Sequence, residues 1–316
     1  MNSAMPVTIS AAEVESACSL IEVVQSQRNA LGGLITGVSV MGPRAVITNG
    51  ENAQFSYIAR ASSTAPTIVK FGSVTGSNSA KGLPVVQAYI GVMDYETGSL
   101  KYFVDGESVT RIRTTAASMV AAQELANKPK YITVIGSAPQ AIAHAKAALE
   151  LFTPEKITIV VRNDAKGDAV RAQFQNSSPI EISMDIEAAV TGSDLIFACT
   201  NAMVPLFKSK LSPGTTCISI GSFAPNREEI SANTVIAADK VFADDAATTE
   251  AQCGSIIPAL SSPNKKWDSV FSIGAVINRT ISGRDNADEI ICYFSVGLGV
   301  QDASFIELLM SKKLNK

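Results

Sequence analysis

The feature that most constrains the fold is a regular alternation of strand-like and helix-like segments that starts at Tyr131. The run Tyr131–Ile135 is apolar and β-branched, and a helical pattern over residues 138–152 follows it. A second strand pattern (157–161) and a second helix pattern (165–174) come next. This alternation is typical of a parallel sheet with helices on both faces. We expect three more strands to extend the sheet, at 195–199, 216–220 and 235–238.

The first hundred residues have a different texture. Ser10 and Glu13 form a capping-box pattern, so we expect a helix within residues 1–30. Gly98 fits the left-handed position of a hairpin loop between residues 93 and 100. The remaining pattern is one of short β-branched runs separated by Gly, Asn, Pro and Ser, which predicts an antiparallel sheet with strands at 38–47, 55–59, 67–71, 85–93 and 100–104.

The domain boundaries follow from the segments between these patterns. Asp105–Gly106 ends the first sheet, and Thr110 can cap an alanine-rich helix that runs through Ala126. The segment Cys292–Leu314 has a helical period and can return to the first domain. We therefore expect a doubly wound α/β domain over residues 115–291 and a smaller α+β domain formed by residues 1–114 and 292–316.

Composition excludes several classes of function. The formal net charge is −3 and no basic patch is evident, so we expect no nucleic-acid partner. No apolar run reaches the ~18 residues of a membrane helix, and residues 1–10 do not read as a signal peptide, so we expect a cytoplasmic protein. Five scattered cysteines and one histidine, His144, predict neither a metal site nor a disulfide framework, and His144 reads as a helix-face residue without a catalytic role.

The turn Ile135–Ala141 lies between the first strand and the first helix of the α/β domain. Gly136 supplies a tight turn, and the next helix would aim its N-terminus at a bound pyrophosphate. Ala138 and Ile142 stand near the places where the usual glycine fingerprint has its second and third glycines, so the turn alone also fits a purely structural role. Its strand–helix–strand context favours a dinucleotide site.

The end of the second strand distinguishes the nicotinamide dinucleotides. A site for NAD usually has an acidic residue there, whereas this strand ends in Arg162–Asn163. An arginine at this corner can pair with the 2′-phosphate of NADP, which favours NADPH. The alternative is a solvated arginine at a strand end.

Three cationic side chains are candidates for a substrate site. Arg111 and Arg113 fall in the expected first turn after Thr110, where their charge opposes the helix dipole, and a bound anion would offset this. Being two residues apart they point to different sides, so we expect at most one, Arg113, to hold a substrate carboxylate. Lys70 interrupts an apolar strand on the same face as Ile68, where it either caps an edge or enters a pocket.

Several segments, in order along nearly the whole chain, resemble the ornithine cyclodeaminase/mu-crystallin family. They are Lys70–Phe71, Lys81–Gln87, Val104–Glu107, Arg113–Ser118, Ile135–Gln140, Ser193–Thr200, Ser212–Thr215 with Ile220–Gly221, and Phe294–Asp302. The resemblance implies an N-terminal substrate and dimerisation domain, a Rossmann domain and a C-terminal helix that rejoins the first domain. It thereby implies a homodimer.

The resemblance also assigns roles to residues. Arg44, Lys70 and Arg113 would line a pocket that holds the carboxylate of an amino or imino acid. The cofactor-binding residues that we expect are Thr114, Gly136, Ser137, Ala138, Pro139, Gln140, Arg162, Asn163, Thr200 and Gly221.

Two departures from the family pattern bear on the reaction. Phe223 stands where cyclodeaminases carry a catalytic aspartate, and Val85 stands in place of a substrate-contacting threonine. Cyclisation of ornithine needs a base, and phenylalanine cannot serve as one. We therefore do not expect ornithine cyclodeaminase activity.

The expected function is the NAD(P)H-dependent reduction of a cyclic ketimine acid, with Lys70 supplying a proton or polarising the substrate. Δ1-Pyrroline-2-carboxylate or Δ1-piperideine-2-carboxylate would give L-proline or L-pipecolate. One alternative is an alanine-type amino-acid dehydrogenase. Another, of a different class, is a crystallin-like protein that binds nucleotide or a small ligand without turnover. An intact set of Arg44, Lys70 and Arg113 favours chemistry over binding alone.

Overall fold

The computed structural model describes residues 5–50, 52–174 and 179–314. Residues 1–4, part of the segment in which no signal peptide is expected, lie outside it. The chain divides into two compact units, one formed by segments 1–116 and 298–316 and the other by residues 117–297. The domain borders that we expected, after residues 114 and 291, lie slightly before the borders of these units, which follow residues 116 and 297. Helix α3 (Gly106–Leu125) contributes residues to both units.

The first unit contains a seven-stranded sheet in the order β1-β7-β6-β5-β4-β2, with β3 paired to β4. Neighbouring strands are antiparallel except β1, which runs parallel to β7. The strand expected over 38–47 is two strands, because Pro43 lacks a backbone N–H and interrupts the ladder. The strands are β1 (Val7–Ile9), β2 (Val40–Met41), β3 (Ala45–Asn49), β4 (Asn52–Arg60), β5 (Thr67–Val74), β6 (Val86–Met93) and β7 (Leu100–Asp105).

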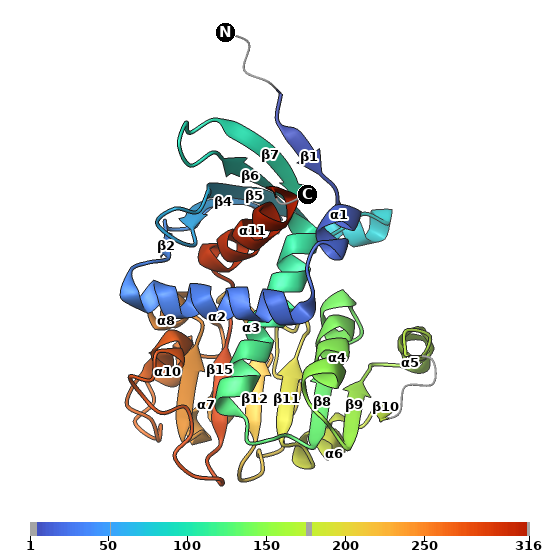
Figure 1. The fold of residues 1–316 in the computed structure, drawn as a ribbon. Coiled ribbons are helices and arrows are strands. Elements are labelled where there is room, and N and C mark those ends of the chain that lie inside the picture. Colours follow the sequence, from blue (N-terminus) through green and yellow to red (C-terminus); the bar gives the residue numbers. More distant parts are fainter. Residues whose placement is uncertain (1–4, 51, 175–178, 315–316) are drawn as a thin grey trace. The chain divides into compact units, whose positions relative to one another are not determined.

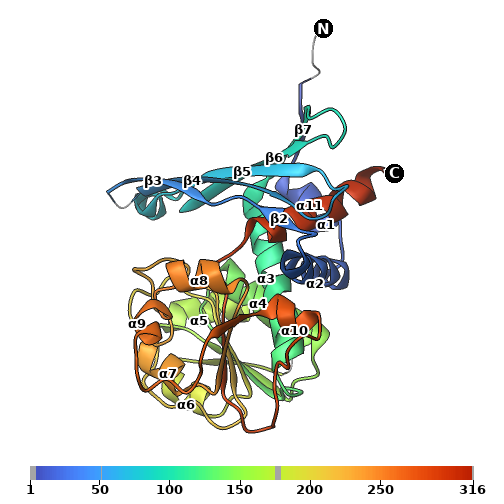
Figure 2. The same ribbon diagram turned by 90° about the vertical axis from the view of Figure 1, so that its left-hand side faces the viewer.

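The long helices of this unit lie on one side of the sheet, as Figure 2 shows. Helix α11 (Gly299–Leu314) packs against β4, β5 and α2 (Leu20–Thr36). The Ser10–Glu13 capping box is confirmed, with the Ser10 N–H donating to Glu13 Oε2 at 2.9 Å, and it opens α1 (Ala11–Ser16). A second capping box starts α2, so the N-terminal segment holds two helices rather than one. A 3-10 helix (Gly76–Lys81) joins β5 to β6.

The second unit contains an eight-stranded, fully parallel sheet in the order β10-β9-β8-β11-β12-β15-β13-β14. Several of these strands can be followed side by side in Figure 1. The chain builds β8 to β10 toward one edge and then β11 and β12 toward the other, so the order reverses between β8 and β11. The strands are β8 (Tyr131–Ile135), β9 (Lys156–Val160), β10 (Ile180–Ser183), β11 (Leu195–Ala198), β12 (Thr216–Ser219), β13 (Lys240–Ala243), β14 (Val270–Ser272) and β15 (Ile291–Phe294).

This reversal identifies the doubly wound α/β architecture that the sequence predicted, with ligands expected at the carboxyl ends of β8 and β11. The helices of the second unit connect its strands. They are the second half of α3, α4 (Pro139–Leu151), α5 (Asp164–Arg171), α6 (Ile186–Thr191), α7 (Ala232–Ala237), α8 (Ala246–Gln252), α9 (Ile257–Leu260) and α10 (Ile273–Ile277).

Three local predictions are wrong. The strand expected at Val235–Ala238 is the end of α7, because the Ser231 hydroxyl accepts a hydrogen bond from the Thr234 N–H at 3.1 Å and starts a helix there. The segment expected to be helical from Cys292 begins as strand β15, and the helix starts only at Gly299.

The third wrong prediction concerns the start of α3. The helix begins at Gly106 rather than after Thr110, and Asp105 Oδ1 accepts a hydrogen bond from the Ser108 N–H at 2.8 Å. Thr110 lies inside the helix, where its hydroxyl donates to the Gly106 carbonyl at 2.5 Å. Arg111 and Arg113 therefore lie beyond the first turn, and the argument from the helix dipole does not apply to them.

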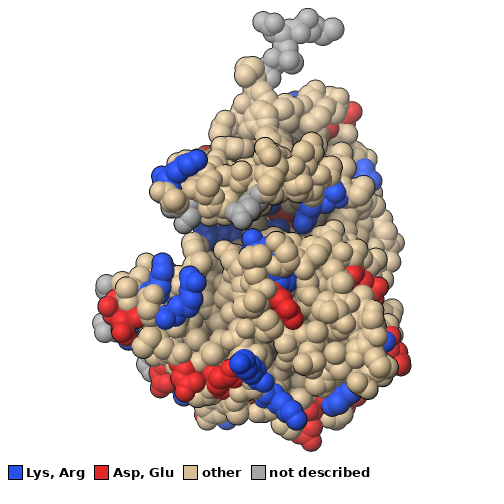
Figure 3. All heavy atoms as spheres, turned by 180° about the vertical axis from the view of Figure 1, so that it is seen from behind, with Lys and Arg blue, Asp and Glu red and all other residues tan. Residues whose placement is uncertain are grey.

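Basic and acidic side chains are interspersed on the face shown in Figure 3, and neither sign covers it. Within the described part of the chain, no helix is long and apolar enough to cross a membrane.

Candidate functional site

Lys70 is buried on the inner face of β5, with a side chain only 3% exposed. It shares this face with Ile68, as strand alternation predicted, but β5 is an interior strand of the sheet, so Lys70 does not cap an edge. A buried ammonium needs a partner to offset its lost hydration. Asp302, in the first turn of α11, is that partner: Lys70 Nζ donates to Asp302 Oδ1 at 2.8 Å.

Asp302 connects three elements of the first unit through its carboxylate. Its Oδ1 also accepts from Arg113 Nε at 3.3 Å, and its Oδ2 accepts from the Tyr57 hydroxyl at 2.6 Å. Lys70 Nζ makes a second hydrogen bond, to the Thr110 hydroxyl oxygen on α3. The side chain of Asp302 is 0% exposed, so these contacts are shielded from solvent.

Burial and the neighbouring charges together shift the pKa values of Lys70, Asp302 and Tyr57. Burial lowers the pKa of Lys70 to about 8, although the adjacent Asp302 carboxylate raises it. Burial also raises the pKa of Asp302, but Arg113 and Lys70 outweigh it and hold that pKa below its usual value. The pKa of the Tyr57 hydroxyl lies well above its ordinary value because of burial and the Asp302 charge. The cluster therefore combines an ionised carboxylate with a lysine able to exchange a proton near neutral pH.

Arg44 adds a further positive charge to this cluster. Its guanidinium carbon lies 5.6 Å from the centre of the Tyr57 ring, and Lys70 Nζ lies 5.9 Å from the same centre. The structure thus brings together Arg44, Lys70 and Arg113, the three residues expected to line a substrate pocket. The charges of Arg44 and Arg113 both act on Lys70, so among the described residues of this cluster the positive charge exceeds that of the Asp302 carboxylate, which favours the binding of an additional anion.

Gln301 extends the cluster toward that anion. Its Oε1 accepts from Arg113 Nη1 at 2.5 Å and from the Leu298 N–H at 3.1 Å. Its Nε2 is buried and has no hydrogen-bond partner among the described residues. A buried amide donor beside a guanidinium is suited to the second oxygen of a carboxylate.

Sequence reasoning missed Tyr57, Gln301 and Asp302. Asp302 had a detectable signal, since it is an acidic residue among mostly uncharged residues in the first half of α11. Tyr57 is paired with Lys70 in the β4–β5 register, a contact that strand patterns alone could have suggested. Neither signal shows that residues 232 positions apart in the chain meet.

The two arginines of α3 have different surroundings, as predicted. Arg111 pairs with Glu15 and is partly exposed, whereas Arg113 is buried and contacts Asp302 and Gln301. Arg113 is therefore a buried residue of the cluster rather than a surface arginine.

In the second unit, Gly136 lies at the point where the strand order reverses. Its φ is +135°, and a Cβ atom there would come within 2.6 Å of the Cys199 carbonyl oxygen, so only glycine fits. Ala138 and Pro139 are exposed and start α4, with Pro139 at its first turn. A compact turn followed by exposed residues at a helix N-terminus fits a dinucleotide pyrophosphate. Ser137 and Gln140 are half-buried in the same turn.

The residues after β9 divide into two roles. Arg162 is exposed, and no acidic side chain among the described residues forms an ion pair with it. Asn163 caps α5 by accepting a hydrogen bond from the Lys166 N–H at 3.0 Å, so its side chain is already in use. Arg162 is therefore the available side chain at this strand end.

Glu229 holds the ends of β11 and β12 together. Its Oε1 accepts from the Thr200 N–H at 2.5 Å and from the Thr200 hydroxyl at 2.8 Å. Its Oε2 accepts from the Ser219 hydroxyl at 2.7 Å and from the Gly221 N–H at 2.6 Å. Burial raises the pKa of Glu229 to about 7 despite these hydrogen bonds. Glu229 thus engages the N–H groups of Thr200 and Gly221 and the Thr200 hydroxyl. The cofactor contacts expected of these two residues would have to use their remaining atoms.

Three further candidates are placed as follows. Thr114, on α3, is half-buried. The Arg227 guanidinium carbon lies 4.7 Å from the centre of the half-buried Phe223 ring, which offers no acid–base group. His144 is fully buried, its Nδ1 lies 2.8 Å from the Gln140 carbonyl oxygen, and burial lowers its pKa to about 4. The five cysteines are all free thiols.

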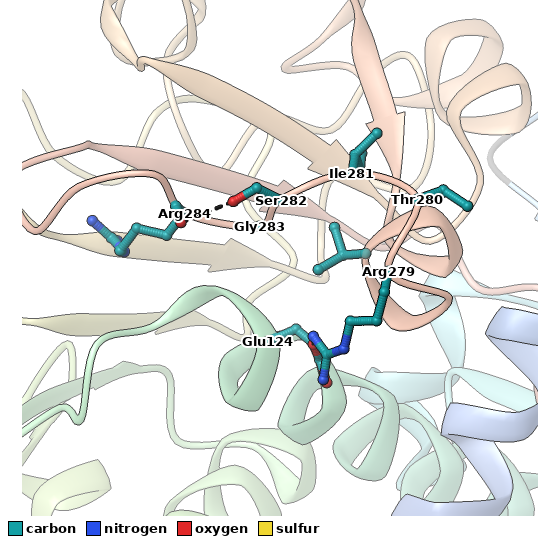
Figure 4. A pocket seen from close by; sticks show the side chains of 8 residues that line it. Glu124, Arg279, Thr280, Ile281, Ser282, Gly283 and Arg284 are labelled. Carbon is teal, nitrogen blue, oxygen red and sulfur yellow. Dashed lines mark hydrogen bonds and ion pairs between the residues drawn. The ribbon is translucent and has the colours of Figure 1, made fainter.

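Figure 4 shows a hollow lined by Glu124 and by the loop after α10. Arg279 extends to Glu124, with Nη1 and Oε2 at 2.8 Å. Arg284 donates to the carbonyl oxygens of Leu125, Gly214 and Glu289, among others, and so joins the end of α3 to two loops. These hydrogen bonds make Arg284 a structural residue rather than a ligand-binding one.

Comparison with known proteins yields one family and several relatives. The profile of the ornithine cyclodeaminase/mu-crystallin family matches residues 5–316. A delta(1)-pyrroline-2-carboxylate reductase of Bacillus thuringiensis subsp. konkukian is 27% identical over 248 residues, which cover 77% of this chain and 76% of the relative. A delta(1)-pyrroline-2-carboxylate/delta(1)-piperideine-2-carboxylate reductase of Azospirillum brasilense is 27% identical over 212 residues, 67% of each chain.

A solved structure has the same fold over nearly the whole chain. The delta(1)-pyrroline-2-carboxylate reductase of Thermococcus litoralis, in complex with NADH and L-proline, superposes with a TM-score of 0.88 and 25% sequence identity. The match covers 98% of this chain and 98% of that one.

Proposed function

The chain belongs to the ornithine cyclodeaminase/mu-crystallin family, and from this membership we propose that it is an oxidoreductase that reduces a cyclic ketimine acid with a nicotinamide dinucleotide. The proposed substrates are Δ1-pyrroline-2-carboxylate and Δ1-piperideine-2-carboxylate, which yield L-proline and L-pipecolate. One observation carries the proposal: the buried Lys70 ammonium and the buried Arg113 guanidinium share the carboxylate of Asp302.

Each part of this cluster has a task in the reaction. Arg113 binds the substrate carboxylate, with Arg44 contributing charge and the Gln301 amide contributing a donor. The Lys70 ammonium gives a proton to the imine nitrogen, so an N–H bond forms there as one Nζ–H bond breaks. A nicotinamide dinucleotide, when bound, would supply the hydride that the imine carbon takes up, and the π-electron pair of the C=N bond would become the lone pair of the amine. Lys70 then regains a proton from water.

We propose NADPH as the preferred cofactor, with NADH also accepted. Arg162 follows β9 and is exposed, at the strand end where the second strand of a Rossmann unit meets the adenosine ribose. A guanidinium there forms charge-assisted hydrogen bonds with a 2′-phosphate, which NADH lacks.

Phe223 argues against ornithine cyclodeamination, because a phenyl ring covered by Arg227 cannot accept a proton. The set of Arg44, Lys70 and Arg113, intact and with Lys70 and Arg113 held by Asp302, favours chemistry over binding without turnover. An alanine-type dehydrogenase would bind its substrate carboxylate at the same site. No contact among the described residues of the cluster favours this alternative over a ketimine reductase.

We further propose that the protein is a homodimer formed through the outer face of the first unit's sheet. Ile58, Phe71 and Tyr89 are 49%, 41% and 52% exposed there, and the rings of Phe71 and Tyr89 lie 6.1 Å apart. The long helices of the unit lie on the opposite side of the sheet (Figure 2). An exposed apolar surface of this kind marks an interface, and a second copy of the chain can pair with it symmetrically. Phe71→Asp should convert a dimer to a monomer in sedimentation velocity.

The test of the proposed function is one set of assays on the purified protein. Oxidation of NADPH and of NADH is followed with each cyclic imino acid and with pyruvate plus ammonium. A separate assay measures the release of ammonia from ornithine in the presence of NAD. We expect turnover with the cyclic imino acids and none with ornithine. Turnover with pyruvate and ammonium alone would make the protein an amino-acid dehydrogenase instead. A cytoplasmic location remains a prediction, which cell fractionation would test.

A further inference from the structure

The carboxylate of Asp302 is placed at the centre of the cluster rather than at its edge. One oxygen, Oδ1, accepts from both Lys70 Nζ and Arg113 Nε, at 2.8 and 3.3 Å. The other oxygen accepts the Tyr57 hydroxyl at 2.6 Å. With both oxygens engaged and no exposed side-chain surface, Asp302 acts through its neighbours rather than by touching a ligand itself.

We propose that Asp302 is the positioning residue of this site, which directs the Lys70 ammonium and keeps it charged. The inference rests on the proposed role of Lys70 as proton donor. It adds that the acid strength of Lys70 is set from the last helix of the chain, by a residue that never contacts the substrate.

The charges around Lys70 give this role its physical basis. Among the described residues, Asp302 is the negative group facing Nζ, whereas Arg113 and Arg44 are positive and the Tyr57 ring and Thr110 hydroxyl are uncharged. Burial and both arginines favour the neutral amine, and Asp302 opposes all three. Without its charge, Lys70 would lose its proton at a lower pH and have less of the acid available for the reaction.

The hydrogen bonds also fix the direction of Lys70. Asp302 Oδ1 and the Thr110 hydroxyl oxygen accept two of the three N–H bonds of the ammonium. One N–H bond remains for the imine nitrogen. Arg113 is aligned by the same carboxylate and by Gln301, so the carboxylate-binding and proton-donating groups share one anchor.

The experiment is the pH profile of kcat for Asp302→Asn, which removes the charge with little change in shape. We expect its alkaline limb to move to lower pH by about one unit or more, so that kcat at pH 9 falls at least about tenfold. The matched control is Tyr57→Phe, which removes a hydrogen bond to the same carboxylate but no charge, and its limb should stay in place. The proposal is overturned if the alkaline limb of kcat lies at the same pH in the parent and in Asp302→Asn. It is also overturned if the limb shifts equally in Asp302→Asn and Tyr57→Phe.

A stability comparison covers the case in which Asp302→Asn folds poorly. That variant leaves Lys70 beside Arg113 and Arg44 without the carboxylate that offsets their charge, whereas Lys70→Met/Asp302→Asn leaves the two arginines and removes the lysine. We expect the double variant to have the higher Tm, and an equal or lower Tm would contradict the proposed charge pairing.

These readouts separate the proposal from the proposed function. If the parent reduces no cyclic imino acid, the proposed function fails, while the Tm comparison still tests the pairing of Asp302 with Lys70. If the parent is active and its alkaline limb does not depend on Asp302, only the role of Asp302 fails.

Discussion

Replacing Lys70 by methionine tests the proposed proton transfer most directly. Methionine keeps the length and most of the volume of the buried side chain but carries no proton to give. A positioned general acid contributes about 10²–10⁴-fold to a rate, which corresponds to ~3–5 kcal/mol at about 1.4 kcal/mol per tenfold. We therefore expect kcat to fall by about 10²–10⁴-fold, with little change in dinucleotide affinity because Lys70 belongs to the other unit.

The local contacts indicate that this variant folds. When Lys70 is lost, Asp302 keeps the Arg113 guanidinium at 3.3 Å and the Tyr57 hydroxyl at 2.6 Å, so its carboxylate stays paired. The lost ion pair is offset in part because a buried ammonium is no longer dehydrated. A far-UV spectrum and a Tm close to those of the parent would assign the change in kcat to chemistry.

The assay is steady-state kinetics with a cyclic imino acid and saturating NADPH, alongside a titration of NADPH binding. Lys101→Met is the matched control, since Lys101 is an exposed lysine on β7 of the same sheet and should keep parental kinetics. If Lys70→Met retains near-parental kcat, the proton comes from water and the reasoning about Lys70 fails. A rise in KM with kcat unchanged would make Lys70 a binding group only.

Three other changes have defined outcomes. Arg113→Ala should leave the substrate carboxylate without its main partner and cost about 2–5 kcal/mol, seen mostly in KM, and an unchanged KM would place the carboxylate elsewhere. Arg162→Ala should weaken NADPH binding much more than NADH binding in fluorescence titrations; equal losses would remove the argument for a 2′-phosphate contact. For Glu229, a folded pKa raised to about 7 means that the unfolding free energy falls as pH rises from 4.5 to 7. Glu229→Gln should flatten that slope, by up to about 3 kcal/mol across the window, in urea melts at a series of pH values; an unchanged slope would show that Glu229 does not titrate there.

Periodic patterns predicted the elements that are determined locally. Strand alternation placed Lys70 on the same face as Ile68, and the Ser10–Glu13 spacing placed a helix start, because both depend on residues close in sequence. The error at Val235–Ala238 is also local: an apolar tetrapeptide fits either a strand or a helix, and the cap at Ser231 decides in favour of the helix.

The cationic residues of the candidate site were predicted from the sequence, but their arrangement around Asp302 was not. Arg113 was selected on the premise that it lies in a helix's first turn, which is wrong, although the residue does belong to the cluster. Its importance comes instead from Asp302, to which it is joined across 189 positions of sequence. Contacts at that separation depend on how α11 packs on the sheet, and no periodicity within either segment encodes them.

The position of Asp302 shows what the return of the chain to the first unit after Gly297 contributes to the site. Without α11, β5 would carry Lys70 on a face lacking the carboxylate that pairs with it, and Arg113 would lose both Asp302 and Gln301. An unpaired lysine at such a depth gives up its proton, and the site would lose its acid. The last helix therefore both completes the core of the first unit and supplies the charge on which the proposed chemistry depends.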